Sequence, residues 1–237
     1  MPVVHDVQQN GPEWLQLRLG RPCSSEFDKI YTRTGKRSRQ VDALRNRLLV
    51  EWITGAPVES IQTAYMQIGH ERENESANAY SFKTGVELHR VGFITNDAGT
   101  YGASPDRLIG DDGILELKNP SAPVHVGYLL AQDIDDDYFV QIQGQMLVTE
   151  RLYVDIASYC PGFPLVTVRV ERDEKYIRLL DTALAEFCER LDEAKRELME
   201  RYGVEPKRRE LPEAQPDKYG FDVTDDDATA IYARTQR

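Results

Sequence analysis

The sequence predicts an α/β fold in which helices flank a central mixed β-sheet. Three observations support this class. Before Gly85, apolar residues recur at spacings of three and four, which is typical of amphipathic helices. From Glu87 the period changes to two, which is typical of strands. A helix, two strands and a long closing helix follow, so both kinds of element contribute to one core.

Four helices are expected in the first third of the chain. Ser25, with Asp28 three residues later, has the spacing of a capping box, so a helix should begin there. Gly55 and Gly85 each follow a helical segment, and glycine commonly ends a helix. The basic segment RTGKRSR (33–39) contains glycine and predicts a loop. The expected helices span residues 13–18, 25–31, 41–52 and 68–83.

Strands predominate in the middle of the chain. The turn formers Asn96-Asp97, Gly110-Asp111-Asp112-Gly113 and Pro161-Gly162 separate segments of alternating character. Gly203 closes a long amphipathic helix with one apolar stripe. The expected strands span 88–95, 100–103, 114–118, 152–158 and 165–170, and the expected helices span 138–149 and 173–202.

Composition limits the class of protein. The net charge of −11 argues against a protein that coats nucleic acid non-specifically, although a local basic channel remains compatible with it. Cys23, Cys160 and Cys188 form no C-x-x-C pair, which indicates free thiols in a reducing compartment. The first residues lack a signal-peptide pattern, so we expect a cytoplasmic protein. We expect one core domain at 1–203 and a charged, proline-containing tail or docking arm at 204–237.

The segment SPDRLIGDDGILELKNP (104–120) carries the main functional signal. Glu116 and Lys118 lie two apart on an expected strand and therefore share a face. One interpretation is a half-exposed strand with an ordinary acid–base pair. The other is a metal-dependent phosphodiesterase centre, in which Asp106 and Glu116 hold a hard divalent cation and Lys118 orients or deprotonates the attacking water. The motif alone leaves both interpretations open.

Two neighbouring helices add polar groups. Residues 71, 73 and 75 are all glutamates, but they cannot all face one partner because positions two apart diverge on a helix. Periodicity alone does not select Glu73. The helix at 138–149 carries a polar stripe, which suits either a solvent-exposed face or the lining of a polar cleft. The stripe consists of Tyr138, Gln141 and Gln145.

Six blocks occur in order along the chain: GPEWLQLRLG (11–20), IGHEREN (68–74), ASPDRL (103–108), ILELKNP (114–120), YFVQIQGQM (138–146) and VERDEKY (170–176). Taken together they resemble the phage lambda exonuclease family, also called the YqaJ-type or alkaline exonuclease family, of the PD-(D/E)XK nuclease superfamily. The resemblance covers roughly residues 11 to 200. It implies a restriction-endonuclease-like core with a central mixed sheet.

The resemblance implies a catalytic metal centre. Its members are Asp106, Glu116 and the Leu117 carbonyl as cation ligands, Lys118 beside the attacking water, Glu73 near a second cation, and Gln141 as the glutamine that helps to set the nucleophile and Lys118. Gln141 is preferred to Gln143, which lies about 200° away around the helix. An all-oxygen site favours Mg²⁺, with two ions implied and Mn²⁺ able to substitute.

The resemblance also implies a pocket for a 5′-phosphate. Arg18 would bind it bidentately, and Ser25 and Ser104 would donate hydroxyl hydrogens, although Ser25 also suits a helix cap and Ser104 a turn. Met66 lies where the family carries an apolar strand-separating wedge, but a buried methionine is the simpler interpretation. The basic loop offers contacts to the DNA backbone or only a solvated surface. Its cations are Arg33, Lys36, Arg37 and Arg39.

The implied activity is 5′→3′ digestion of double-stranded DNA from an end, leaving a 3′ overhang for phage-type recombination. A ring-shaped homotrimer and a single-strand annealing recombinase as partner are implied with it. The segment between Pro120 and Tyr138 departs from the family, because it seems shorter and contains no lysine or arginine. Two alternatives stay open, namely a PD-(D/E)XK endonuclease and a non-catalytic scaffold that binds DNA ends.

Overall fold

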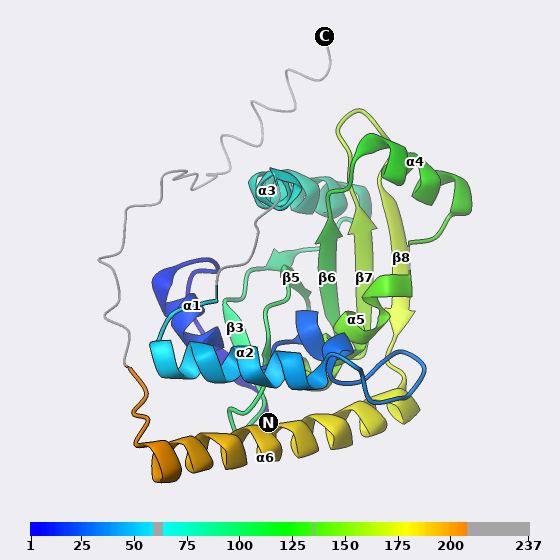
Figure 1. Ribbon diagram of the computed structural model, residues 1–237. Coiled ribbons are helices and arrows are strands. Elements are labelled where there is room, and N and C mark those ends of the chain that lie inside the picture. Colours follow the sequence, from blue (N-terminus) through cyan, green and yellow to red (C-terminus); the bar gives the residue numbers. More distant parts are fainter. Residues whose placement is uncertain (59–63, 135, 208–237) are drawn as a thin grey trace.

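The computed structural model describes residues 1–58, 64–134 and 136–207, with only the backbone described at 64–71 and 136 (Figure 1). No described helix is long and apolar enough to cross a membrane. The larger sheet has the strand order β2-β5-β6-β7-β8. Its strands are β2 (Leu88–His89), β5 (Arg107–Ile109), β6 (Gly113–Lys118), β7 (Tyr153–Ser158) and β8 (Val166–Glu171). Strands β6 and β7 run parallel and all other neighbours antiparallel, so the predicted mixed sheet is confirmed.

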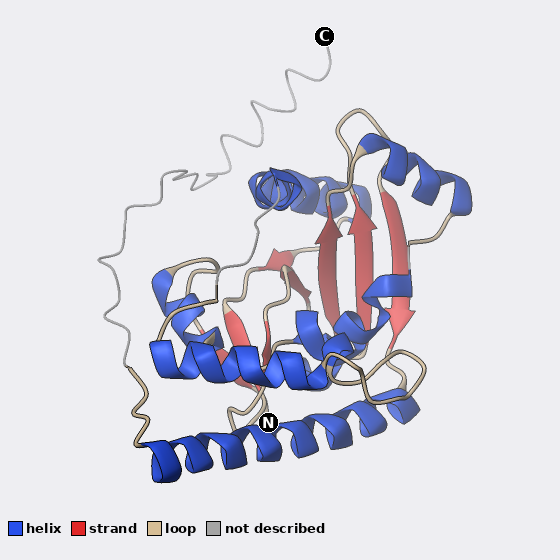
Figure 2. Ribbon diagram, in the orientation of Figure 1, coloured by secondary structure: helices blue, strands red, loops and turns tan. Residues whose placement is uncertain are grey.

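Helices lie on both faces of this sheet (Figure 2). Helix α5 (Phe139–Thr149) packs through Ile142 and Met146 against the β6 side chain of Ile114. Helix α3 (Ala64–Thr84) packs through Tyr80 against the face that carries Leu115 and Leu117. Alternate residues of a strand point to opposite faces, so burial between two helices turns Glu116 toward α5 and into the protein interior.

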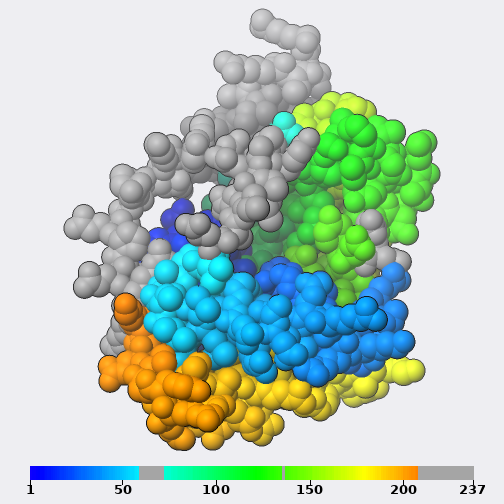
Figure 3. Space-filling model, viewed as in Figure 1, coloured from blue at the N-terminus to red at the C-terminus, as the bar shows by residue number. Residues whose placement is uncertain are grey.

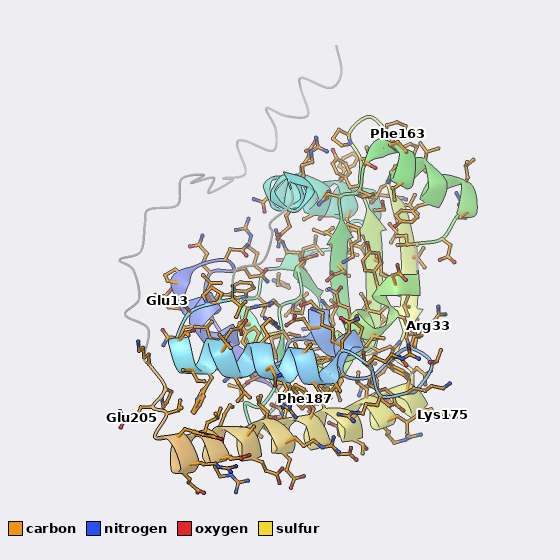
Figure 4. All side chains as sticks on the ribbon, in the orientation of Figure 1. Glu13, Arg33, Phe163, Lys175, Phe187 and Glu205 are labelled. Carbon is orange, nitrogen blue, oxygen red and sulfur yellow. The ribbon has the colours of Figure 1, made fainter. Side chains whose placement is uncertain are left out.

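A second core lies beside the larger sheet. It is formed by the three-stranded antiparallel sheet β1-β3-β4, the 3₁₀ helix η1 and the helices α2, α5 and α6. Helices α2 and α6 lie against one another (Figure 3), and Phe187 points from α6 toward α2 (Figure 4). The short helix α1 precedes η1 in the chain. The bounds are β1 Val3–His5, β3 Phe93–Thr95, β4 Gly102–Ala103, α1 Pro12–Arg18, η1 Ser24–Lys29, α2 Val41–Thr54 and α6 Glu174–Tyr202.

Several predicted helix ends are confirmed. Gly55 follows α2 with φ 64°, in the left-handed region that glycine enters without strain, and its N–H donates to the Glu51 carbonyl. At the start of α6, the Asp173 carboxylate accepts hydrogen bonds from the N–H groups of Lys175 and Tyr176. This is the usual role of an N-cap aspartate, and it places the start of α6 within one residue of the prediction.

Other predictions were wrong in detail. The helix expected from Ser25 is the 3₁₀ helix η1, and no side chain caps it. The strand expected at 88–95 is two short strands, β2 and β3, which belong to different sheets. The segment at 121–137, where no helix or strand was predicted, contains helix α4 (Ala122–Ala131) and the beginning of the short 3₁₀ helix η2 (Asp136–Tyr138). Strands β1 and β5 were not predicted, because three residues show too little alternation to reveal a strand. Residues 208–237 of the predicted tail lie outside the described residues.

Candidate active site

Asp106 and β6 meet where β5 begins. The Leu117 N–H donates to the Asp106 carboxylate, with 2.6 Å between N and Oδ2. Glu116 and Lys118, on either side of Leu117, point to the opposite face from Leu115 and toward α5. The structure therefore brings together the three charged residues of the predicted motif.

Glu116 is only 4% exposed, and both oxygens of its carboxylate have donors. Oε1 accepts hydrogen bonds from Lys118 Nζ and from Gln141 Nε2, each at 2.7 Å. Oε2 accepts one from Gln145 Nε2 at 2.8 Å. Gln143, by contrast, donates to the Glu171 carbonyl at the end of β8 and accepts from the backbone before α6. The polar stripe thus lines a site, and Gln145 belongs to it although no role had been assigned to that residue.

Lys118 is held from two sides. Its Nζ contacts Glu116, and it lies 4.0 Å from the centroid of the Tyr138 ring. Burial alone would lower the pKa of Lys118, but Glu116, Asp106 and Tyr138 together raise it by more, so the net shift is upward. The Lys118 ammonium therefore remains charged and serves as a fixed positive charge at neutral and alkaline pH.

The Asp106 carboxyl has too few positive groups around it to offset its burial and its acidic neighbours. Burial of its carboxyl raises its pKa, and the neighbouring charges of Glu116 and Glu73 raise it further. The Leu117 N–H and Lys118 act in the opposite direction but do not compensate, so the pKa lies well above its usual range. A buried carboxylate in this environment is relieved by a cation, and oxygen donors suit Mg²⁺ or Mn²⁺. The donor set therefore fits a hard divalent cation.

Pro105 explains how the Leu117 carbonyl can join that donor set. The antiparallel register pairs Arg107 with Leu115, and two residues further it would place Pro105 opposite Leu117. The N–H and carbonyl of one residue point to the same edge of a strand, so the Leu117 carbonyl points toward this position too. Proline has no N–H to donate. The Leu117 carbonyl therefore lies on the Asp106 side without a donor from residue 105.

The structure distinguishes the glutamates of α3. Glu73 Oε1 accepts a hydrogen bond from Arg107 Nη1, on the strand that follows Asp106. Glu75 accepts a hydrogen bond from the Tyr159 hydroxyl at 2.6 Å. The side chain at position 71 lies outside the described residues. In the described ranges, no three His, Cys, Asp or Glu side chains gather as metal ligands. Glu73 is near enough for its charge to raise the pKa of Asp106, but its Oε1 is held by Arg107.

Trp14 joins two members of the predicted phosphate pocket. Its indole Nε1 donates to Ser104 Oγ at 2.7 Å, and the Arg18 guanidinium lies 4.2 Å from the centroid of its ring. An indole N–H can only donate, so Ser104 must accept it and keeps its own hydroxyl hydrogen for another acceptor. The sequence analysis missed Trp14, although it precedes Arg18 by one helical turn.

Ser25 is exposed at the start of η1. A parallel bridge pairs Cys23 with Gly102, and the Gly102 N–H donates to the Pro22 carbonyl. Ser25 follows Cys23 by two residues, and Ser104 follows Gly102 by two residues. The bridge therefore joins the segment that leads into η1 and Ser25 to β4, which leads to Ser104.

The basic loop lies close to the same site. Arg33 lies over the Phe139 ring at 5.4 Å, and the neighbouring Tyr138 covers Lys118. Lys36, Arg37 and Arg39 are exposed on this loop between η1 and α2, and Figure 4 shows Arg33 at the end of the molecule where α6 begins. The Met66 side chain, the predicted wedge, lies outside the described residues.

Comparisons with known proteins identify the family of the chain. The model of the YqaJ-like viral recombinase domain matches residues 13–152. The structure of an alkaline exonuclease, LHK-Exo, from Laribacter hongkongensis is 30% identical, with 81% of this chain and 97% of that chain covered and a TM-score of 0.71. Its complex with dAMP is 28% identical over the same shares, with a TM-score of 0.72.

A phage related exonuclease from Haemophilus somnus shares the fold at 14% identity, with 75% of this chain and 96% of that chain covered and a TM-score of 0.57. No curated protein sequence matches the chain. The family model nevertheless covers more than half of the chain, and the mixed sheet between α3 and α5 is the core expected of a PD-(D/E)XK nuclease. The chain belongs to the YqaJ-like viral recombinase domain family, as its six sequence blocks predicted.

Proposed function

We propose that the protein is a Mg²⁺-dependent 5′→3′ exonuclease that digests the 5′-phosphorylated strand of double-stranded DNA ends to mononucleotides and leaves a 3′ overhang. Membership of the family makes it a nuclease, a hydrolase acting on DNA. One observation supports the finer proposal more than any other. Ser104, held by Trp14, and Asp106, held by Leu117, are two residues apart in one turn. An anion-binding group and a cation-binding group therefore lie side by side.

A divalent cation held by Asp106, Glu116 and the Leu117 carbonyl would neutralise charge on the scissile phosphate and lower the pKa of a bound water. Side chains of this protein set the orientation of Glu116 and the position of the Lys118 charge. Gln141 fixes Glu116 in one orientation through its amide, as Gln145 does from the next turn of α5. The Lys118 ammonium, held between Glu116 and Tyr138, places a positive charge beside the attacking oxygen.

The phosphate pocket supports the choice of strand end. Arg18 offers a planar guanidinium that matches two phosphate oxygens, and stacking on Trp14 restricts its motion. Ser104 and Ser25 add hydroxyl donors. A 5′-phosphate bound there would place the first phosphodiester beside Asp106, which favours release of one nucleotide at a time.

The wider assembly follows from the same proposal. The protein would act in the cytoplasm of a bacterial host, as a homotrimeric ring around DNA and together with a single-strand annealing recombinase. The exposed cations Lys36, Arg37 and Arg39 would contact the DNA backbone, and Met66 would part the strands. Residues 1–203 would form the nuclease domain and residues 204–237 a docking arm.

The decisive experiment is digestion of a linear duplex with one 5′-phosphorylated end and one 5′-hydroxyl end, in Mg²⁺. We expect loss of the phosphorylated strand from its 5′ end, little attack on the hydroxyl end, and no digestion by Lys118→Ala. Arg18→Ala should lose the preference for the phosphorylated end while it keeps slow hydrolysis, because the cation ligands are untouched.

The alternatives give different results. Cleavage of a closed circular duplex would identify an endonuclease of the same fold. Binding to DNA ends without hydrolysis in either Mg²⁺ or Mn²⁺ would identify a scaffold. Equal digestion of both ends by the wild type would leave the cation site in place and remove the Arg18 pocket from the proposal.

A further inference from the structure

Arg107 is a buried cation beside the proposed cation ligand Asp106, and it is not among the predicted site residues. It is only 6% exposed. Its Nη1 donates to Glu73 Oε1 and to the Asp106 carbonyl, and its Nη2 donates to Asn74 Oδ1 at 2.9 Å. One guanidinium thus ties β5 to α3 next to the turn that carries Asp106.

These contacts engage the Glu73 carboxylate. Arg107 is buried, whereas Glu73 is partly exposed. Taking the carboxylate away from a buried arginine leaves an uncompensated charge, which opposes the replacement of Arg107 by a metal cation at Glu73. Glu73 Oε1 is therefore already bound to a cation of this chain, although Glu73 lies near enough for its charge to act on Asp106.

Arg107 is also placed where it can act on the substrate's charge. Arg107 and Glu73 line a hollow of about 580 Å³, together with Arg90 and the segment at 6–10. Arg90 Nη2 donates to Asn74 Oδ1 at 2.7 Å, and among the described residues Arg90 forms no hydrogen bond or ion pair with Glu73. The two arginines therefore share Asn74, while Arg107 alone of the two holds the carboxylate. This difference makes Arg90 a matched control.

We propose that Arg107 is a positioning residue that holds Glu73 and provides the fixed positive charge where a second cation would otherwise be needed. Without DNA, the protein would then bind one divalent cation, at Asp106, Glu116 and Leu117, and not two. The inference rests on the proposed metal-dependent nuclease function. The inferred number of bound cations, one, differs from the two that the family resemblance implies, because Arg107 of this chain already holds Glu73.

The test is the number of Mn²⁺ ions bound by the full chain without DNA, measured by titration calorimetry and by electron paramagnetic resonance of free Mn²⁺. We expect one ion for the wild type and one for Arg90→Gln. Arg107→Gln should free Glu73 and raise the count to two. The double variant Arg107→Gln/Glu73→Gln should return it to one.

If Arg107→Gln does not fold, the single variant Glu73→Gln still tests the inference. We expect its count and affinity for Mn²⁺ to match those of the wild type, because Glu73 is not a ligand. Two ions in the wild type, falling to one in Glu73→Gln, would overturn the inference and leave the nuclease proposal intact. No bound ion in the wild type would overturn both.

Discussion

Gln145 Nε2 lies 2.8 Å from Glu116 Oε2, and both side chains are almost completely buried, at 1% and 4% exposure. With Lys118 and Gln141 on the other oxygen, the Glu116 carboxylate has a donor on each side. Its orientation is therefore set by α5 as well as by its own strand. A carboxylate held in this way cannot rotate freely when a cation or a phosphate arrives.

Gln145→Leu should lower both stability and activity. The substitution leaves Glu116 Oε2 buried without its donor, which costs about 1–3 kcal/mol. Gln143→Leu is the control, because Gln143 is equally buried on the same helix but bonds Glu171 and the start of α6. We expect the two variants to lose similar amounts of melting temperature. Only Gln145→Leu should also lose kcat, by at least tenfold. Equal kcat values for the two folded variants would show that Gln145 has only a structural role.

Pro105→Ala should weaken cation binding. Alanine restores an N–H opposite the Leu117 carbonyl, where it can pair with the carbonyl and reduce its availability as a ligand. Pro161→Ala, in the exposed turn between β7 and β8, controls for the general effect of removing a proline. We expect the Mg²⁺ concentration for half-maximal digestion to rise several-fold in Pro105→Ala and to stay unchanged in Pro161→Ala. An unchanged value in both would contradict the account of Pro105.

Gly144→Ala should destabilise the protein although alanine favours helices. Replacing a glycine inside a helix normally gains about 1 kcal/mol. A Cβ at position 144, however, would lie 2.5 Å from Phe27 Cδ2, where α5 packs against η1. Overpacking of this kind costs about 1–3 kcal/mol, so we expect a net loss. Gly127→Ala in α4 meets no atom within 4 Å and should raise the free energy of unfolding; chemical denaturation of both variants tests the contrast.

Stability should fall above about pH 9. Burial raises the pKa of the Cys188 thiol from 9.0 to about 11, so the folded chain keeps a proton that the unfolded chain releases at lower pH. The stabilisation is complete below pH 9 and is lost as the pH rises toward 11, by up to about 3 kcal/mol. Burial and the hydrogen bond to Asp181 also raise the pKa of Tyr101, so its titration lowers stability at high pH in the same way.

Melting temperatures of the wild type, Cys188→Ala and Tyr101→Phe between pH 7 and pH 11 test this prediction. The difference between each variant and the wild type should shrink as the pH rises, because the variant has no proton to lose. Tyr202→Phe, at a tyrosine that is 65% exposed, should follow the wild-type curve at a constant offset. Parallel curves for all four proteins would rule out the titration of Cys188 and Tyr101 as the cause.

The longer elements could be predicted because their signals are local. Helix α2 repeats apolar residues over four turns and ends at a glycine, and β7 and β8 alternate over six residues each. Strands β1 and β5 escaped prediction because each has only three residues, and their partners lie far away in the sequence. Helix α4 was missed because its residues are apolar on most sides and offer no clear period.

The sequence alone determined that Glu116 and Lys118 share one face of a strand, since strand alternation is a local property. Only the tertiary structure decided which polar groups meet them. That Glu73 pairs with Arg107, that Gln145 bonds Glu116 and that Trp14 holds Ser104 depends on how elements distant in sequence pack. A side chain's hydrogen-bond partner is set by packing in three dimensions, whereas its strand or helix is largely set by its neighbours in the chain.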